Sequence, residues 1–286
     1  MPTWTTLELL RWTTGYLGEK GLPDPRLNAE LLLADTLGVK RLDLYLQFDR
    51  PMRPEELADF KARLLRRARR EPLQYIAGEA AFRHLTLQVD RRVLIPRPET
   101  ELLVERVLEW CHGRTGLVAL DIGTGSGAIA LSLASEGGAF ERVVATDLSA
   151  DALEVARGNA RRTLPSAVLE FRQGAGFAPV AEERFDAIVS NPPYVGDGEG
   201  ASLDPEVREW EPPVALFAGA DGLTVIRELV GRAADHLRPR GLLALEIGAD
   251  QAAAVAGLIR ATGRFDEPRV HEDYAGRDRI VMAELA

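Results

Sequence analysis

The chain has 286 residues, of which 46% are hydrophobic and 28% are charged, and its formal net charge is −9. These values are typical of a folded globular protein with one large domain or two modest ones, and they exclude a largely disordered chain. No apolar stretch approaches the length that spans a bilayer, and the N-terminus lacks a basic segment followed by an apolar core. We therefore expect a cytoplasmic protein that does not associate with a membrane.

The charge is spread unevenly along the chain. Residues 1–95 carry 16 basic and 13 acidic side chains, whereas the remainder carries 19 and 31. A C-terminal part this acidic is poorly suited to gripping a phosphate backbone, so we expect a protein partner and no direct contact with nucleic acid. Cys111 is the only cysteine, and the four histidines form no ligand pattern, so no metal site is predicted.

Residues 1–78 are predicted to form an N-terminal helical domain. One amphipathic helix begins at Pro25 and stops at Gly38, and another begins at Pro54 and ends before Pro72. The second of these carries a basic run. We interpret the run as a solvated helix face, with contact to a partner as the alternative. Its members are Lys61, Arg63, Arg66, Arg67, Arg69 and Arg70.

Residues 79–96 are expected to link two domains. Apolar and polar residues alternate over residues 81–95, on either side of Asp90-Arg91-Arg92. Such alternation around a polar turn is typical of a β-hairpin, with the turn at these three residues. Pro96-Arg97-Pro98-Glu99-Thr100 then predicts a stiff turn into a helix, and the second domain occupies residues 97–286.

A glycine-rich loop follows the first predicted strand of this second domain. The apolar residues 117–122 lead into Gly123-Thr124-Gly125-Ser126-Gly127, and residues 128–134 have helical composition. Glycines at such a turn let main-chain N–H groups approach a ligand at the N-terminus of a helix. A second strand over residues 142–146 ends in Asp147, at the distance from the glycines where a carboxylate can bind ribose hydroxyls.

The same loop satisfies the permissive Gly-x-Gly-x-x-Ala fingerprint of dinucleotide-binding proteins, through Gly123, Gly125 and Ala128. A nicotinamide dehydrogenase is therefore one alternative, and a purely structural turn is another. Asp121 favours a different ligand, because a carboxylate just before the first glycine can hold a cationic group such as the amino group of a methionine moiety.

The most specific motif is Asn191-Pro192-Pro193-Tyr194, which follows an apolar strand predicted over residues 185–190. Each proline lacks a main-chain N–H, so the loop offers acceptors without donors. The side-chain oxygen of Asn191 and the carbonyl oxygen of Pro192 can accept both hydrogens of a planar –NH2 group, while the Tyr194 ring lies against its face. This arrangement suits an amide or a ring amine. A strand end with a packed tyrosine is the alternative.

A conjugated –NH2 group is a poor nucleophile because its lone pair is delocalised. Two accepted hydrogen bonds return electron density to the nitrogen, orient it for attack and stabilise the positive charge that develops as a bond forms. The motif therefore indicates alkylation of nitrogen without a strong general base. It argues against the dehydrogenase, because hydride transfer has no use for an acceptor of amine hydrogens.

Strands and helices alternate through the rest of the chain. This alternation predicts a parallel, doubly wound α/β sheet. Two C-terminal segments, 269–272 and 279–283, have no helix between them, which predicts an antiparallel hairpin at the edge of the sheet. The other predicted strands are 168–171, 185–190 and 242–247, and the helices between them are near 150–161, 223–237 and 251–261.

These motifs carry a resemblance to a known family. The segment 121–127, Asp147 and Asn191-Pro192-Pro193-Tyr194 resemble the class I S-adenosylmethionine-dependent amino-methyltransferases. Within that class, nearly the whole chain is similar to the peptide chain release factor glutamine methyltransferases, the HemK/PrmC family. The further segments that carry this resemblance are residues 74–78, residues 94–101, Glu211-Pro212, Glu246-Ile247-Gly248 and residues 273–279.

The resemblance implies an enzyme that uses S-adenosyl-L-methionine to methylate the side-chain amide nitrogen, N5, of the glutamine in the Gly-Gly-Gln motif of class 1 release factors. It implies a Rossmann-like, seven-stranded class I methyltransferase domain, preceded by a small helical domain that helps hold the release factor and by the hairpin linker. A monomer without a metal is expected. By position, the catalytic residues are Asn191, Pro192 and Tyr194, which bind the substrate amide together with Pro193. The implied cofactor-binding residues are Gly123, Thr124, Gly125, Ser126, Gly127, Asp147, Gly176 and Asn191.

One stretch departs from the family pattern. Family members commonly have an acidic or aromatic residue near the adenine, whereas this chain has Gln173-Gly174-Ala175-Gly176-Phe177. Neither Ala175 nor Gly176 can form a hydrogen bond or stack through its side chain, so we expect the main chain or Phe177 to hold the adenine. Residues 96–100 are expected to line the pocket, or else only to start the following helix.

Three alternatives remain open at this point. A ribosomal-protein glutamine methyltransferase would use the same chemistry. An adenine-N6 or cytosine-N4 nucleic-acid methyltransferase would present its ring amine to the same acceptors, although the acidic C-terminal part and the lack of an evident target-recognition insert disfavour it. A cofactor-binding scaffold without activity is the third.

Overall fold

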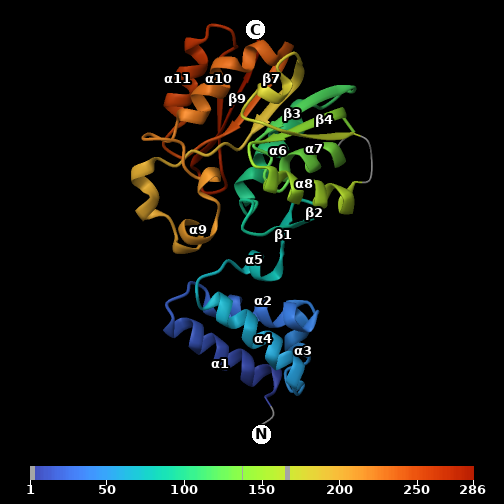
Figure 1. The fold of residues 1–286 in the computed structure, drawn as a ribbon, viewed down its shortest axis with the longest axis vertical. Helices are drawn as coiled ribbons and strands as arrows, with labels where there is room; N and C mark the ends of the chain where they lie inside the picture. Colours follow the sequence, from blue (N-terminus) through green and yellow to red (C-terminus); the bar gives the residue numbers. More distant parts are fainter. Residues whose placement is uncertain (1–3, 137, 165–167) are drawn as a thin grey trace. The chain divides into compact units, whose positions relative to one another are not determined.

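The computed structural model describes residues 4–136, 138–164 and 168–286. The chain divides into two compact units (Figure 1). The first, named the helical unit, contains Met1–Gly78 and Asp204–Trp210, and the second, named the sheet unit, contains Glu79–Leu203 and Glu211–Ala286. In the described part of the chain, no helix combines the length and the apolar character needed to cross a bilayer.

The helical unit is built around apolar helix faces. Pro25 opens its second helix, and Gly38 ends that helix with a φ of +64°. Leu17, Leu33 and Phe60 are among the fully buried side chains of its core. Within the described residues, the unit comprises α1 (Thr6–Glu19), α2 (Pro25–Leu37), α3 (Arg41–Leu46), α4 (Pro54–Arg67), α5 (Leu73–Ala77) and α9 (Pro205–Trp210).

The basic run on α4 and the turn after it differs from the prediction of a solvated face. Arg63 pairs with Asp35 and Asp59, and Arg66 donates to both oxygens of Glu71, at 2.7 and 2.9 Å. Asp35 and Glu71 lie on other segments, so periodicity along α4 does not reveal them, whereas Asp59 lies four residues before Arg63 on α4 itself. In the run as a whole, the residues that point into solvent are Lys61 and Arg69, whereas those that form ion pairs within the unit are Arg63, Arg66, Arg67 and Arg70.

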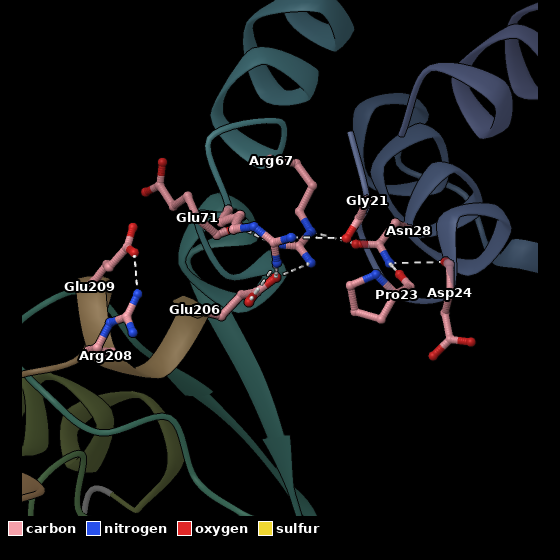
Figure 2. A network of polar contacts seen from close by, with 10 residues as sticks. Gly21, Pro23, Asp24, Asn28, Arg67, Glu71, Glu206, Arg208 and Glu209 are labelled. Atoms are coloured by element: carbon pink, nitrogen blue, oxygen red, sulfur yellow. Dashed lines mark hydrogen bonds and ion pairs between the residues drawn. The ribbon is translucent and has the colours of Figure 1, made fainter. Parts of the chain in front are cut away.

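Arg67 ties the short helix α9 to the rest of the helical unit (Figure 2). Its side chain is only 5% exposed, and it donates to Asn28 Oδ1 at 2.5 Å, to the main-chain oxygen of Glu71 at 3.1 Å and to Glu206 Oε1 at 3.0 Å. Arg70 reaches the same carboxylate at 3.4 Å. Sequence alone assigns α9 to the methyltransferase domain. In the structure α9 belongs to the helical unit because of contacts with residues that are distant in the sequence, such as the pair of Glu206 with Arg67.

The sheet unit begins with a β-hairpin, but the predicted position of its turn is wrong. Strands β1 (Glu79–Phe82) and β2 (Leu85–Gln88) pair antiparallel and leave only Arg83 and His84 in the turn. Arg83 has a left-handed φ of +51°, and its guanidinium pairs with Glu136 at 2.6 Å. The alternation extends past the strands because further apolar residues are buried outside them. These residues are Val89, Val93 and Ile95.

The main sheet has seven strands in the order β5-β4-β3-β6-β7-β9-β8. The first five of these pair in parallel, and β9 runs antiparallel to both of its neighbours. The predicted doubly wound sheet and its reversed C-terminal hairpin are therefore confirmed. The strands are β3 (Leu117–Ile122), β4 (Phe140–Asp147), β5 (Leu169–Gln173), β6 (Phe185–Ser190), β7 (Leu237–Glu246), β8 (Arg269–Glu272) and β9 (Asp278–Glu284).

Helices cover both faces of this sheet (Figure 1). Apolar residues of α6 (Pro98–Trp110) and α7 (Ala128–Ser135) pack in one core, and those of α10 (Thr224–His236) and α11 (Ala252–Ala261) pack in the other. β3 is buried at every position, as expected for a central parallel strand. The remaining elements of the unit are α8 (Ala150–Thr163) and the 3₁₀ turns η1 (Ala178–Val180), η2 (Asp197–Ser202) and η3 (Pro213–Ala215).

Candidate active site

The strand register places the predicted site residues at one edge of the sheet. Ile122 pairs with Thr146 on β4 and with Ser190 on β6, and Ser190 pairs with Leu245 on β7. The order of the strands reverses between β3 and β6, and open α/β sheets bind ligands beside such a reversal, at the carboxyl ends of the strands. The residues that come next along these strands at that edge are Gly123, Asp147, Asn191 and Glu246.

The glycine loop leaves β3 in a conformation that only glycine adopts readily. Gly123 and Gly125 have φ values of +75° and +55°, and a β-carbon on either would meet no atom within 4 Å. Glycine is therefore needed for the backbone path, and open space lies beside it. Gly127 serves packing instead, because a β-carbon there would lie 3.1 Å from Leu131 on α7. The loop thus has an open side beside a helix N-terminus. Its main-chain N–H groups are largely in use, because those of Gly123 and Thr124 donate to the Thr146 oxygen and that of Gly125 donates to Asp147, so the loop offers a ligand room more than free donors.

Thr124 and Ser126 support this loop from within. Both residues are buried, and the Thr124 hydroxyl donates to Asp121 Oδ2 at 2.6 Å. The main-chain oxygen of Ser126 accepts from Asn159 Nδ2 at 2.9 Å. Both side chains of these predicted cofactor-binding residues are therefore buried, and their main-chain oxygens already accept from the Gly127 N–H and from Asn159.

Asp147 binds the glycine loop through its carboxylate. Its Oδ2 accepts from the main-chain N–H of Gly125 at 2.9 Å, and its Oδ1 accepts from that of Ser149 at 2.8 Å. Burial raises the pKa of the Asp147 carboxyl. Each oxygen keeps a second lone pair, so the group can still accept hydrogen bonds from a pair of hydroxyls.

Asp121 supplies a test of whether a cationic ligand fits this site. The residue is fully buried, and Oδ2 accepts from Thr124 Oγ1 and from the Ala130 N–H. Within the described residues, nothing donates to its buried Oδ1. Burial raises the pKa of Asp121 to about 7, and the neighbouring Asp147 charge adds to the effect. An unpaired buried carboxylate oxygen is costly, so an ammonium group of a ligand fits this position.

Asn191 presents its side-chain oxygen and not its nitrogen. Asn191 Nδ2 donates to Thr100 Oγ1 at 3.0 Å, and the Thr100 hydroxyl donates to Glu246 Oε2 at 2.6 Å. Among the described residues, none donates to Asn191 Oδ1 or to the carbonyl oxygen of Pro192. The two acceptors predicted from the sequence are therefore both available for a planar –NH2 group.

Tyr194 is held in place by its main chain as well as its ring. Its carbonyl oxygen accepts from Gln251 Nε2 at 2.9 Å, and Gln251 Oε1 in turn accepts from the Gly248 N–H. The ring packs against the core beneath α10 and α11. Burial raises the pKa of the Tyr194 hydroxyl to about 12, so the ring is neutral at physiological pH.

The structure contradicts one expectation about adenine. Phe177 is fully buried, and its ring stacks on His236 with centroids 4.4 Å apart, so it is not available to stack on a ligand. Gly176 has a φ of +49°, and a β-carbon there would lie 3.1 Å from Glu228 Oε1. The main chain is the part of this stretch that can still contribute.

The turn before α6 combines the two roles considered for it. Pro98 opens α6, so the turn does start a helix, and Thr100 on its first turn contacts Asn191. Arg97 donates to both oxygens of the buried Glu211, at 2.7 and 2.8 Å.

Sequence reasoning gave Glu246 no role of its own. The available signal was the carboxylate that directly follows the apolar residues 242–245.

Comparison with known proteins identifies the family of the chain. Residues 8–78 match the family model "PrmC N-terminal domain", and residues 98–204 match "Methyltransferase small domain". Release factor glutamine methyltransferase from Geobacter sulfurreducens is 44% identical over 278 residues, which are 97% of this chain and 96% of that one. The proteins of the same name from Chlorobaculum tepidum and Cereibacter sphaeroides are 44% and 43% identical, over 96% and 97% of this chain and 96% and 98% of theirs.

Solved structures share the fold at low sequence identity. The catalytic domain of hMettl16 has a TM-score of 0.55 at 16% identity, covering 83% of this chain and 84% of that one. A methyltransferase from Pyrococcus furiosus has a TM-score of 0.52 at 22% identity, covering 80% of this chain and 98% of that one. The chain is an S-adenosylmethionine-dependent methyltransferase and belongs to the release factor glutamine methyltransferase family.

Proposed function

We propose that the protein methylates the side-chain amide nitrogen, N5, of the glutamine in the Gly-Gly-Gln motif of class 1 peptide chain release factors. The observation that carries this proposal is the pair of available acceptors, Asn191 Oδ1 and the Pro192 carbonyl oxygen, at the carboxyl edge of β6. They follow directly after β6, which pairs with β3, and β3 leads into the glycine loop. The names of the relatives point to the same substrate class.

The proposed role of the acceptors is to activate an unreactive nitrogen. Asn191 Oδ1 accepts one hydrogen of the glutamine –NH2 group, and the Pro192 carbonyl oxygen accepts the other. Both bonds strengthen as positive charge develops on the nitrogen, so they stabilise the transition state more than the bound substrate. The neutral Tyr194 ring supports the flat face of the amide. A carboxylate substrate, which has no hydrogens to donate, is rejected.

The residues proposed to contact the cofactor lie at the same carboxyl edge of the sheet. S-adenosylmethionine, when bound, supplies a methyl group on a positively charged sulfur. Asp121 Oδ1 would accept from its amino group, and Asp147 from its ribose hydroxyls. The open side of Gly123 and Gly125 would leave room for the methionine moiety and its carboxylate. These assignments rest on the chemistry of the donor and acceptor groups.

We assign the helical domain of residues 1–78 to binding of the release factor, with residues 79–96 as the linker. Trp12 on α1 is 49% exposed and Leu65 on α4 is 45% exposed, although both are large apolar side chains. They border a hollow of about 320 Å³, and the exposed Lys61 lies at its edge. Exposed apolar surface around a hollow is typical of a protein-binding site. The residues that line it are Trp4, Leu9, Trp12, Tyr16, Leu57, Phe60, Lys61, Leu64 and Leu65.

The test is mass spectrometry of a purified, unmethylated release factor after incubation with the enzyme and S-adenosylmethionine. We expect one methyl group on the glutamine of the Gly-Gly-Gln motif. A release factor with glutamate at that position is the matched control, because it keeps the shape of the side chain but lacks the –NH2 group. Parallel reactions contain ribosomal protein, DNA and RNA. Methylation of one of these in place of the release factor would displace the proposal.

A further inference from the structure

Three side chains that are far apart in the sequence form one hydrogen-bonded chain behind the substrate acceptors. Asn191 Nδ2 donates to Thr100 Oγ1 at 3.0 Å across 91 positions, and Thr100 Oγ1 donates to Glu246 Oε2 at 2.6 Å across 146 positions. Thr100 is 4% exposed and Glu246 is 1% exposed, so water does not compete for these bonds. All three residues belong to the sheet unit.

The chemistry of the three groups fixes the direction of every bond. An ionised carboxylate only accepts, so the single hydroxyl hydrogen of Thr100 must point to Glu246. Thr100 Oγ1 then has only lone pairs to offer to Asn191, and an amide oxygen in that position would face another acceptor. Asn191 must therefore turn its –NH2 group to Thr100. Its Oδ1 is left facing the substrate position.

We propose that Thr100 and Glu246 are positioning residues that hold the Asn191 amide in the one orientation that can accept a hydrogen bond from the substrate –NH2 group. The inference rests on the proposed function, because it gives a role to the orientation of Asn191. Neither residue touches the substrate in this account. Without them the amide can rotate by half a turn, and its –NH2 group then meets the –NH2 group of the substrate as donor against donor.

The carboxylate is the part of this chain that responds to pH. Burial raises the pKa of Glu246 to about 7, against the opposing effects of the Thr100 hydrogen bond and of the nearby Arg279 and Arg97 guanidinium groups. The Glu99 carboxylate raises it further. A protonated Glu246 can donate to Thr100, which frees the Thr100 hydroxyl to donate to Asn191 Oδ1. Protonation of Glu246 at lower pH therefore allows the Asn191 side-chain amide to take either orientation.

The kinetic test compares Thr100→Val with Thr100→Ser, using the release factor as substrate. Thr100→Val keeps the shape but loses the hydroxyl, and we expect kcat to fall roughly 10- to 100-fold while the KM for S-adenosylmethionine stays unchanged. Thr100→Ser restores the hydroxyl and most of the activity. Thr163→Val is the matched control, because it removes a hydroxyl that donates to the Asn159 carbonyl at the end of α8.

The pH profile separates positioning from simple packing. For the wild type, kcat should fall as the pH drops through about 7, and Thr100→Ser should show the same acidic limb. In Glu246→Gln this limb should vanish and activity should be low at every pH, because a neutral amide can donate or accept and no longer fixes Thr100. Wild-type kcat in Thr100→Val, or an unchanged acidic limb in Glu246→Gln, would overturn the proposal.

A second measurement does not depend on the substrate. The Asn191 side-chain amide of ¹⁵N-labelled protein is identified by NMR as the signal missing in Asn191→Ala. In the wild type its hydrogens should be protected from exchange at pH 8 and lose protection near pH 6, whereas in Thr100→Val they should be unprotected at both. If the exchange protection of the Asn191 amide hydrogens is the same in Thr100→Val as in the wild type, the proposal that Thr100 positions Asn191 is overturned. If this signal behaves as expected but no release factor is methylated, the proposed function fails and the positioning stands.

Discussion

A β-carbon on Gly222 would lie 2.1 Å from the main-chain oxygen of Tyr194, so the loop after β6 closes directly onto this glycine. Gly222 has a φ of +70°, which other residues adopt only with strain. The same Tyr194 oxygen accepts a hydrogen bond from Gln251. One end of the loop is therefore fixed by Gly222 and Gln251, and the other end by Thr100 through Asn191.

Gly222→Ala should displace this loop. The β-carbon would force Tyr194 away from Gln251 and strain the backbone, so we expect a loss of about 2 kcal/mol of stability and more than a tenfold drop in kcat. Thermal unfolding and the methylation assay measure the two effects. Gly231→Ala is the control, because a β-carbon there meets no atom within 4 Å on the exposed side of α10. That change should leave activity unaltered and add up to about 1 kcal/mol of stability. Equal behaviour of the two variants would contradict the close approach.

Asn191→Ala should abolish methylation while S-adenosylmethionine binding stays within a few fold of the wild type. The reason is that the proposed contact of Asn191 Oδ1 is with the substrate amide, whereas Asp121, Asp147 and the glycine loop lie on the neighbouring strands. Isothermal titration calorimetry gives the affinity, and mass spectrometry gives the activity. Equal loss of binding and activity would show that Asn191 belongs to the cofactor site instead.

The sequence predicts most of the fold because the central strands β3 and β6 are mostly apolar runs that end at a recognisable signal. The strand predicted over residues 185–190 matches β6, and the glycine loop and Asp147 mark the ends of β3 and β4. The linker hairpin was misplaced because its alternation continues beyond the paired residues. Burial by tertiary packing and burial by strand pairing give the same local pattern.

The acceptor motif could be found from the sequence because it is contiguous. The groups that orient it could not, since Thr100 and Glu246 lie 91 and 55 positions from Asn191. The register of β6 with β7 places Glu246 near it, and the packing of α6 on β7 places Thr100. The stacking role expected for Phe177 failed for a related reason. Its ring completes the core against His236, and nothing local distinguishes a core ring from one that faces a ligand.

Asp121→Asn should stabilise the protein in a pH-dependent manner. The folded state holds the proton of Asp121 up to about pH 7, whereas the unfolded chain releases it near the ordinary value of 3.8. The contribution of Asp121 to the free energy of unfolding of the wild type therefore falls as the pH rises from about 4 to 7. Repulsion from the Asp147 carboxylate adds to this loss. Asparagine keeps an acceptor for Thr124 and Ala130 without the buried charge. At pH 8 we expect a gain of about 1 to 3 kcal/mol that shrinks towards pH 4, measured by denaturant unfolding.

The same variant should bind S-adenosylmethionine more weakly, because the amide –NH2 group would face the amino group of the cofactor. Ligand-induced stabilisation should then be smaller in Asp121→Asn than in the wild type. Glu182→Gln removes one exposed charge and controls for net charge. A variant that gains no stability at pH 8, or one that binds the cofactor as tightly as the wild type, would contradict the role assigned to the unpaired Oδ1.

Glu206→Gln should loosen the helical unit, because it leaves the buried Arg67 guanidinium without its counter-charge. Arg67 is 5% exposed and Glu206 is 18% exposed, so water cannot replace the lost carboxylate well, and we expect α4 and α9 to lose about 3 kcal/mol of protection in hydrogen exchange measured by mass spectrometry. Glu209→Gln is the matched control on the same helix (Figure 2). Its pair with Arg208 joins side chains that are 51% and 42% exposed, so this change should cost less than about 1 kcal/mol. Equal exchange in the two variants would mean that Asn28 and the Glu71 carbonyl hold Arg67 without help from α9.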